Sequence, residues 1–93
     1  MRNRPPLKAK RDANEPEIFE TLRAFGLSVH SMDRPADAIV GYSGLTYLVE
    51  VKMPKGKFTP AQVEFKKTWK GDYHVLRSVE DAEVFARWVR DLM

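Results

Sequence analysis

The chain has 93 residues, no cysteine and a formal net charge of +3. This length corresponds to one domain, and a hydrophobic content of 43% is enough to build a core. The absence of cysteine excludes a disulfide framework and a thiolate metal site. The sequence has no apolar run of about 18 residues, so it predicts no membrane span. We therefore expect a soluble, cytoplasmic protein with no membrane partner.

The N-terminal residues 1–11 are predicted to form a flexible basic arm. They contain five basic residues and no acid, and the pair Pro5 and Pro6 disfavours regular structure. Residues 12–93 are predicted to form a single folded domain.

A helix is predicted over residues 14–26. Ile18 and Leu22 recur at helical spacing with other apolar residues, and Gly26 ends the pattern. The helix start has two candidate capping boxes, Asp12 with Glu15 or Asn14 with Glu17.

Three strands, a second helix, a fourth strand and a third helix are predicted after it. Alternating runs predict the strands, the segment from Gly41 to Gly44 predicts a tight hairpin turn, and Thr59 with Pro60 predicts a helix start. The order α-β-β-β-α-β-α indicates an α/β (α+β) fold with a mixed sheet flanked by helices. The predicted strands cover residues 27–32, 36–42, 45–53 and 73–78, and the later helices cover residues 60–69 and 79–93.

Two acids and a lysine are predicted to meet at one end of this hairpin. Side chains alternate across a strand, so Glu50 and Lys52 point to the same face. With a turn centred on Ser43 and Gly44, Asp37 falls opposite Glu50. Two carboxylates about 4 Å apart repel by roughly 4 kcal/mol at an effective dielectric of about 20, so they need a cation or a proton. A cysteine-free oxygen site favours a hard divalent ion, Mg²⁺ above all.

The first helix contributes a third acid. Glu15 lies on its apolar stripe, whereas Glu17 and Glu20 fall on its polar side. A buried carboxylate is costly unless it is paired or binds a metal ion. Glu15 is therefore a further candidate metal ligand, with helix capping as the alternative role.

The pattern of Asp37, Glu50 and Lys52, with twelve residues between the acids, resembles the PD-(D/E)xK nuclease superfamily. Over about residues 11–85, the chain has a helix with an acid, a hairpin with this pattern and a helix with a glutamine. This order is similar to the small stand-alone VRR-NUC proteins, the virus-type replication and repair nucleases of phages and bacteria. The family usually has proline directly before the aspartate, whereas here Pro35 stands one residue earlier.

The resemblance implies a restriction-endonuclease-like core that binds Mg²⁺, with Mn²⁺ able to substitute and no small-molecule cofactor. Lys52 would orient the attacking water, and Gln62 would support the lysine or a phosphate. The implied catalytic residues are Asp37, Glu50, Lys52 and Gln62, and the implied metal ligands are Glu15, Asp37, Glu50 and the backbone carbonyl of Val51.

A basic segment follows the candidate site. Residues 51–70 contain six lysines and one glutamate, whereas residues 79–93 contain four acids and two arginines. Such a cluster suits a polyanion, because each phosphate contact releases counterions. The candidate nucleic-acid-binding residues are Arg11, Lys55, Lys57, Lys66, Lys67 and Lys70.

The leading hypothesis is a metal-dependent, structure-specific DNA endonuclease. No sequence-reading motif is visible, and the resemblance implies branched DNA such as Holliday junctions, cut by a homodimer. The closing helix, through Trp88, Val89 and Leu92, is a candidate dimer interface. Two alternatives stay open: a catalytically inactive nucleic-acid-binding module with the same fold, and a small interaction protein whose basic face only confers solubility.

Overall fold

The computed structural model describes residues 11–92, so the predicted arm lies outside the described residues except for Arg11. The element order is the predicted α-β-β-β-α-β-α. None of the helices within residues 11–92 has the length and apolar character that crossing a bilayer requires. The helices are α1 (Glu15–Ala24), α2 (Pro60–Thr68) and α3 (Val79–Asp91), and the strands are β1 (Ser28–Ser31), β2 (Ala38–Tyr42), β3 (Leu45–Val51) and β4 (Tyr73–Leu76).

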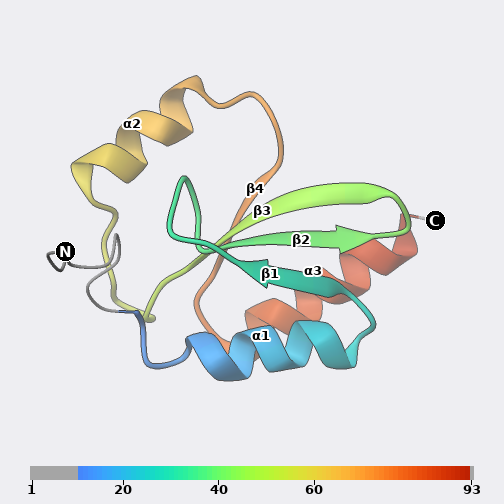
Figure 1. The fold of residues 1–93 in the computed structure, drawn as a ribbon. Coiled ribbons are helices and arrows are strands. Elements are labelled where there is room, and N and C mark those ends of the chain that lie inside the picture. Colours follow the sequence, from blue (N-terminus) through green and yellow to red (C-terminus); the bar gives the residue numbers. More distant parts are fainter. Residues whose placement is uncertain (1–10, 93) are drawn as a thin grey trace, which may run out of the picture.

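The four strands form one mixed sheet in the order β1-β2-β3-β4. β2 pairs antiparallel with both β1 and β3, and β4 runs parallel to β3. A parallel pair needs a crossover connection, and α2 lies within it. Figure 1 shows α1 and α3 side by side along one face of the sheet, whereas α2 stands apart from them on the other side.

A two-residue turn at Ser43 and Gly44 joins β2 to β3. Both residues have positive φ, 52° and 84°, which is the backbone of the type I′ turn that matches the twist of a hairpin. The resulting register pairs Ala38 with Val49. Asp37 therefore stands opposite Glu50, as predicted from the sequence.

The hydrophobic core lies between this sheet and the helices α1 and α3. Ile18 and Leu22 of α1 and Phe85 and Val89 of α3 repeat at helical spacing, and each is at most 5% exposed. Burial of an apolar side chain of this size stabilises the fold by about 1.5–3 kcal/mol. The strands contribute Val40, Val49, Val51 and Leu76 to the same core.

The predicted dimer interface on α3 is wrong in one residue. Val89 is fully buried, because it shares the inward-facing stripe of α3 with Phe85. Trp88 and Leu92 are exposed on the same helix. Val89 therefore belongs to the core of a single chain, and only its two neighbours are available at the surface.

The start of α1 also differs from the prediction, because neither capping box forms. Asn14 is the N-cap residue, but its side chain accepts no capping hydrogen bond. Its amide group instead donates to the backbone carbonyls of Lys52 and Arg77, both at 3.1 Å. Buried carbonyls require hydrogen-bond partners, so Asn14 joins the start of α1 to the ends of β3 and β4.

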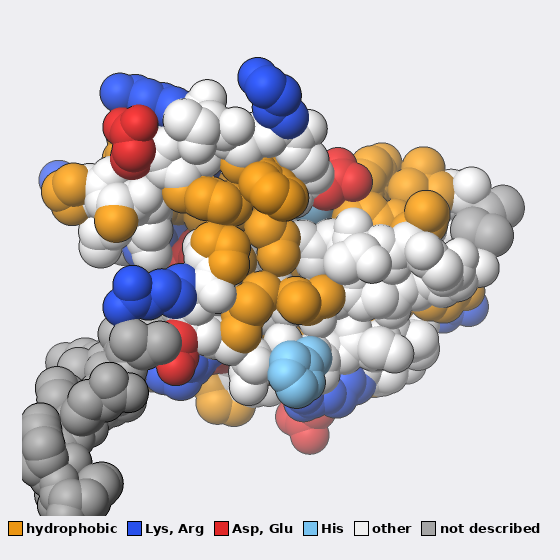
Figure 2. Space-filling model, turned by 45° about the horizontal axis from the view of Figure 1, so that its top comes forward, with side chains coloured by type: hydrophobic (Ala, Val, Ile, Leu, Met, Phe, Trp, Pro, Cys, Tyr) orange, Lys and Arg blue, Asp and Glu red, His pale blue; other side chains and the backbone are white. Residues whose placement is uncertain are grey.

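The other face of the sheet is covered only in part. The register places His30, Ile39, Leu48 and Tyr73 in one row across it. Figure 2 shows hydrophobic side chains gathered on this side of the molecule, between α2 and the sheet. α2 has no buried residue of its own and reaches the sheet through contacts such as Phe65 against Tyr73, with ring centroids 5.5 Å apart.

Candidate functional site

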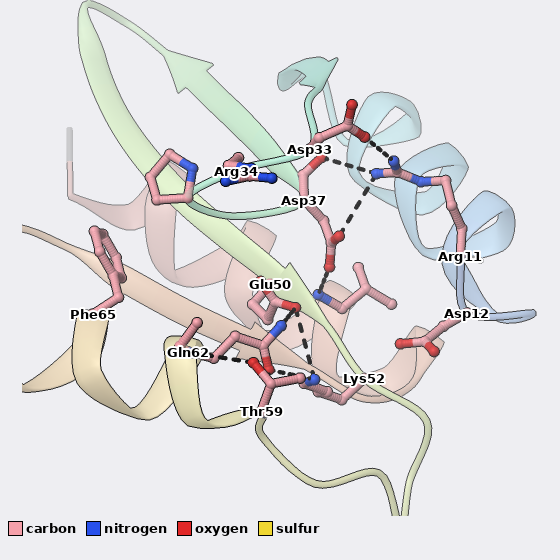
Figure 3. A pocket seen from close by; sticks show the side chains of 13 residues that line it. Arg11, Asp12, Asp33, Arg34, Asp37, Glu50, Lys52, Thr59, Gln62 and Phe65 are labelled. Atoms are coloured by element: carbon pink, nitrogen blue, oxygen red, sulfur yellow. Dashed lines mark hydrogen bonds and ion pairs between the residues drawn. The ribbon is translucent and has the colours of Figure 1, made fainter. Parts of the chain in front are cut away.

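A cavity of about 470 Å³ lies where the β1–β2 loop, the end of β3 and the start of α2 meet. Figure 3 shows its lining side chains, which come from these three segments and from Arg11 and Asp12 before α1. All four predicted catalytic residues line this cavity: Asp37, Glu50, Lys52 and Gln62.

Asp37 and Glu50 are both buried, with exposures of 5% and 2%. One oxygen of Asp37, Oδ2, accepts a hydrogen bond from the backbone N–H of Val51 at 2.7 Å. Oε2 of Glu50 accepts one from Nε2 of Gln62 at 2.9 Å. These contacts fix two carboxylates on one side of the sheet, and burial of their charge favours a cation nearby.

The negative charge of this pair also affects Tyr73 on β4. Burial raises the pKa of Tyr73 to about 12, and the charges of Glu50 and Asp37 add to the effect. A negative phenolate is disfavoured next to carboxylates, just as a cation is favoured. Burial is the larger cause of this change, and the two carboxylates contribute the smaller part.

Lys52 provides the positive charge inside the site. Its side chain is mostly buried, and Nζ lies 3.9 Å from Oε2 of Glu50. The ammonium group donates to Oε1 of Gln62 at 2.6 Å and to the carbonyl of Lys57 at 3.1 Å. Since both charged partners are buried, this is not an exposed surface pair of small energetic value.

Gln62 connects the two charged side chains to the start of α2. Its Oε1 accepts from Lys52 and also from the backbone N–H of Thr59, while the Thr59 hydroxyl accepts from the N–H of Gln62. The last two bonds form a capping box. The same side chain therefore begins the helix and orients the site.

Glu15 is buried, as predicted, but its carboxylate is held by Arg11. Nε and Nη2 of Arg11 donate to its two oxygens at 2.6 and 2.7 Å. Within residues 11–92, no three His, Cys, Asp or Glu side chains lie close enough together to hold a metal ion. The expected convergence of Glu15 on Asp37 and Glu50 is therefore not present, because an arginine already compensates the charge of Glu15.

Two carboxylates nevertheless suit Mg²⁺. This ion is usually bound through one or two carboxylates and completes its shell with water and substrate phosphates. Asp37 and Glu50 supply such a pair at the end of β3. Val51 lines the same cavity, where its backbone N–H donates a hydrogen bond to Asp37.

The predicted nucleic-acid-binding residues are all exposed, and Arg11 differs from the lysines in that its guanidinium group also pairs with Glu15. Lys66 approaches Phe58, with Nζ 4.6 Å from the centre of the ring. The exposed lysines form what we call the basic rim, which consists of Lys55, Lys57, Lys66, Lys67 and Lys70.

Arg77 is a residue that sequence reasoning missed. Its Nη1 donates to the carbonyls of Met53, Pro54 and Gly56 at 2.9, 3.3 and 2.8 Å. Arg77 therefore orders the loop that carries part of the basic rim. Its partners are more than 20 residues away in the sequence, so no local pattern indicates this role.

Comparison with family models, with curated proteins and with solved structures finds no significant match to this chain.

Proposed function

We propose that this protein is a Mg²⁺-dependent endodeoxyribonuclease, with Mn²⁺ able to substitute. The observation that carries the proposal is the buried set of Asp37, Glu50 and Lys52 in one cavity, where Gln62 joins Glu50 to Lys52. The basic rim beside it supports a substrate rich in phosphates. The resemblance to VRR-NUC proteins supports the finer proposal of a homodimer that cuts branched DNA such as Holliday junctions.

The proposed reaction is the hydrolysis of one phosphodiester bond. A water molecule gives up a proton as its oxygen bonds to phosphorus. The bond from phosphorus to the leaving oxygen breaks, and the leaving oxygen takes up a proton. A divalent ion, when bound, supplies Lewis-acid polarisation of the phosphodiester. Asp37 and Glu50 would hold this cation, since the hydrogen bonds from Val51 and Gln62 fix both carboxylates in place.

Lys52 acts on the attacking water and on the charge that develops at phosphorus. Nζ of Lys52 donates to Oε1 of Gln62 and to the carbonyl of Lys57, and these bonds hold it near Glu50. Gln62 is a positioning residue in this scheme, because it orients both Lys52 and Glu50.

Cleavage of four-way junctions and linear duplexes with Mg²⁺, at several protein concentrations, tests the proposal. We expect Glu50→Gln and Lys52→Met each to lower the rate at least about 100-fold, since each removes a group that acts on the transition state. Gln62→Leu should lower it by about 10–100-fold through lost positioning. Glu17→Gln, an exposed acid on α1, is the matched control and should retain the parent rate. Parent-like cleavage by the first two variants would overturn the assignment.

One observation favours the alternative of an inactive nucleic-acid-binding module, namely the pairing of Glu15 with Arg11. Calorimetric titration with Mg²⁺ separates the two proposals. A binding module would give no metal-dependent heat and would bind DNA fully in the presence of a chelator. The nuclease should bind the metal, and Glu50→Gln should weaken that binding.

A further inference from the structure

The guanidinium group of Arg11 contacts three carboxylates, of which Asp33 and Asp37 line the site cavity and Glu15 lines a second cavity. It forms two hydrogen bonds with Glu15, and its Nη1 donates to Oδ1 of Asp33 at 3.1 Å. Its Nη2 donates to the backbone carbonyls of Met32 and Asp37, and lies 3.6 Å from Oδ1 of the Asp37 side chain. Figure 3 shows Arg11 reaching toward Asp33 and Asp37 from the far side of the cavity.

The contacts of Arg11 differ in strength. The bonds to Glu15 are short and bidentate, whereas the distance to the Asp37 carboxylate exceeds the range of about 2.7–2.9 Å expected for a charge-assisted hydrogen bond. The hydrogen bond with Glu15 raises the pKa of Arg11, so the guanidinium stays charged. Its side chain is 34% exposed, which leaves room for movement at the Asp37 end.

A divalent ion bound to Asp37 would meet this guanidinium as a like charge. The two cations compensate the same carboxylate, and repulsion between charges a few ångströms apart is large in a partly buried site. If Arg11 moves away, Glu15 is left as a buried charge without its partner, which is costly unless another cation replaces it. The binding of the metal and the contact between Arg11 and Asp37 therefore oppose each other, and such coupling is reciprocal.

We propose that Arg11 is an internal cation that competes with a divalent ion for the carboxylate of Asp37. Without metal, the guanidinium compensates the acids around it. When metal binds, the contact between Arg11 and Asp37 opens. This inference rests on the proposed function, because it concerns how the metal site of that function is filled.

Titration calorimetry with Mn²⁺ alone, without DNA, tests this competition. We expect Arg11→Gln to bind Mn²⁺ more tightly than the parent by about fivefold or more, which is the lower end of typical coupling between sites. Arg34→Gln is the matched control, because Arg34 is an exposed arginine that lines the same cavity. Its affinity should stay within about twofold of the parent, as expected for loss of one exposed charge.

The double variant Arg11→Gln/Glu15→Gln identifies the source of the gain. Its affinity should stay above that of the parent, because the cation that competes for Asp37 is absent in both variants. Unchanged or weaker binding by Arg11→Gln, or a gain that is lost in the double variant and so came from the uncompensated charge of Glu15, would overturn the inference alone. Absence of Mn²⁺ binding in both the parent and Arg11→Gln would overturn the proposed function with it.

A further variant decides the question if Arg11→Gln does not fold. Arg11→Lys keeps the charge but cannot form the bidentate pair with Glu15. It should bind Mn²⁺ more tightly than the parent, by a smaller factor than Arg11→Gln would, because one positive charge remains but the guanidinium that reaches both Glu15 and Asp37 is absent. Affinity equal to or below that of the parent would contradict the competition.

Discussion

At the scale of single residues, Gln62 explains why the site requires an amide. A glutamate at this position would also complete the capping box of α2. It would, however, place a third carboxylate against Glu50, where Nε2 of Gln62 now donates a hydrogen bond. The amide satisfies an acid and an ammonium group at the same time, so Lys52 and Glu50 stay oriented without added charge.

His74 on β4 makes the stability of the fold depend on pH. Its ring packs among the rings of Tyr47, Phe85 and Trp88. Burial lowers the pKa of His74 below its ordinary value of 6.5, an effect that Asp72 opposes in part. The folded state thus binds the proton less well than the unfolded chain, and stability falls as the pH drops through and below 6.5.

We expect His74→Phe to remove much of the loss of stability between about pH 7 and pH 5, because phenylalanine keeps the ring contacts and does not titrate. Urea unfolding at a series of pH values measures this. His30→Gln, a change to the exposed histidine of β1, serves as the control and should keep the parent profile. A His74→Phe profile as steep as that of the parent would contradict the expectation.

At the scale of elements, α2 is the helix with the least support from the core within residues 11–92. It buries no residue, and its N-terminus is tied to the sheet through Gln62. The stability of α2 therefore depends on its cap and on a few side-chain contacts, and its opening is expected to be local.

Removal of the Thr59 hydroxyl tests this local stability. Thr59→Ala removes the hydroxyl that accepts a hydrogen bond from the backbone N–H of Gln62. It keeps the second bond of the capping box, in which the backbone N–H of residue 59 donates to Oε1 of Gln62. A lost cap costs about 1 kcal/mol, so amide hydrogen exchange within α2 should become about fivefold faster. Exchange in α1 and α3 should not change. Equal acceleration in all three helices would mean that α2 unfolds only together with the core.

At the scale of the whole molecule, the two faces of the sheet differ in the side chains that they carry. The face toward α1 and α3 carries the core, and the face toward α2 carries the buried charges of the site. The site residues Glu50 and Lys52 lie at the end of a strand whose opposite face is packed, so their positions follow from the rigidity of the core. The basic rim lies in the segment between β3 and β4, beside this charged end.

The basic rim predicts that DNA binding weakens with salt. If four of its lysines contact phosphates, affinity should fall roughly 100-fold between about 50 and 200 mM salt. Replacing both Lys66 and Lys67 by glutamine should lower the slope of log affinity against log salt by about 1.8. Fluorescence anisotropy in a chelator measures binding without cleavage. Affinity that does not change with salt would instead support a basic face that only confers solubility.

The sequence by itself determined the element order and the meeting of the candidate site residues Asp37, Glu50 and Lys52. A two-residue turn at Ser43 and Gly44 and the alternation of side chains along a strand are local rules, so they bring Asp37 opposite Glu50 and turn Lys52 to the same face. Gln62 follows from another local rule, the capping box three residues after Thr59.

The tertiary structure alone decided which partners the remaining charged and polar groups take. Asn14 leaves the expected cap to bind carbonyls at the ends of β3 and β4, and Arg11 holds the carboxylate of Glu15. Strand and helix periodicity determines the direction of a side chain, but not which distant group lies there. That choice depends on how α1 packs against the sheet, because a buried charge or carbonyl is stable only with the partner that packing brings within reach.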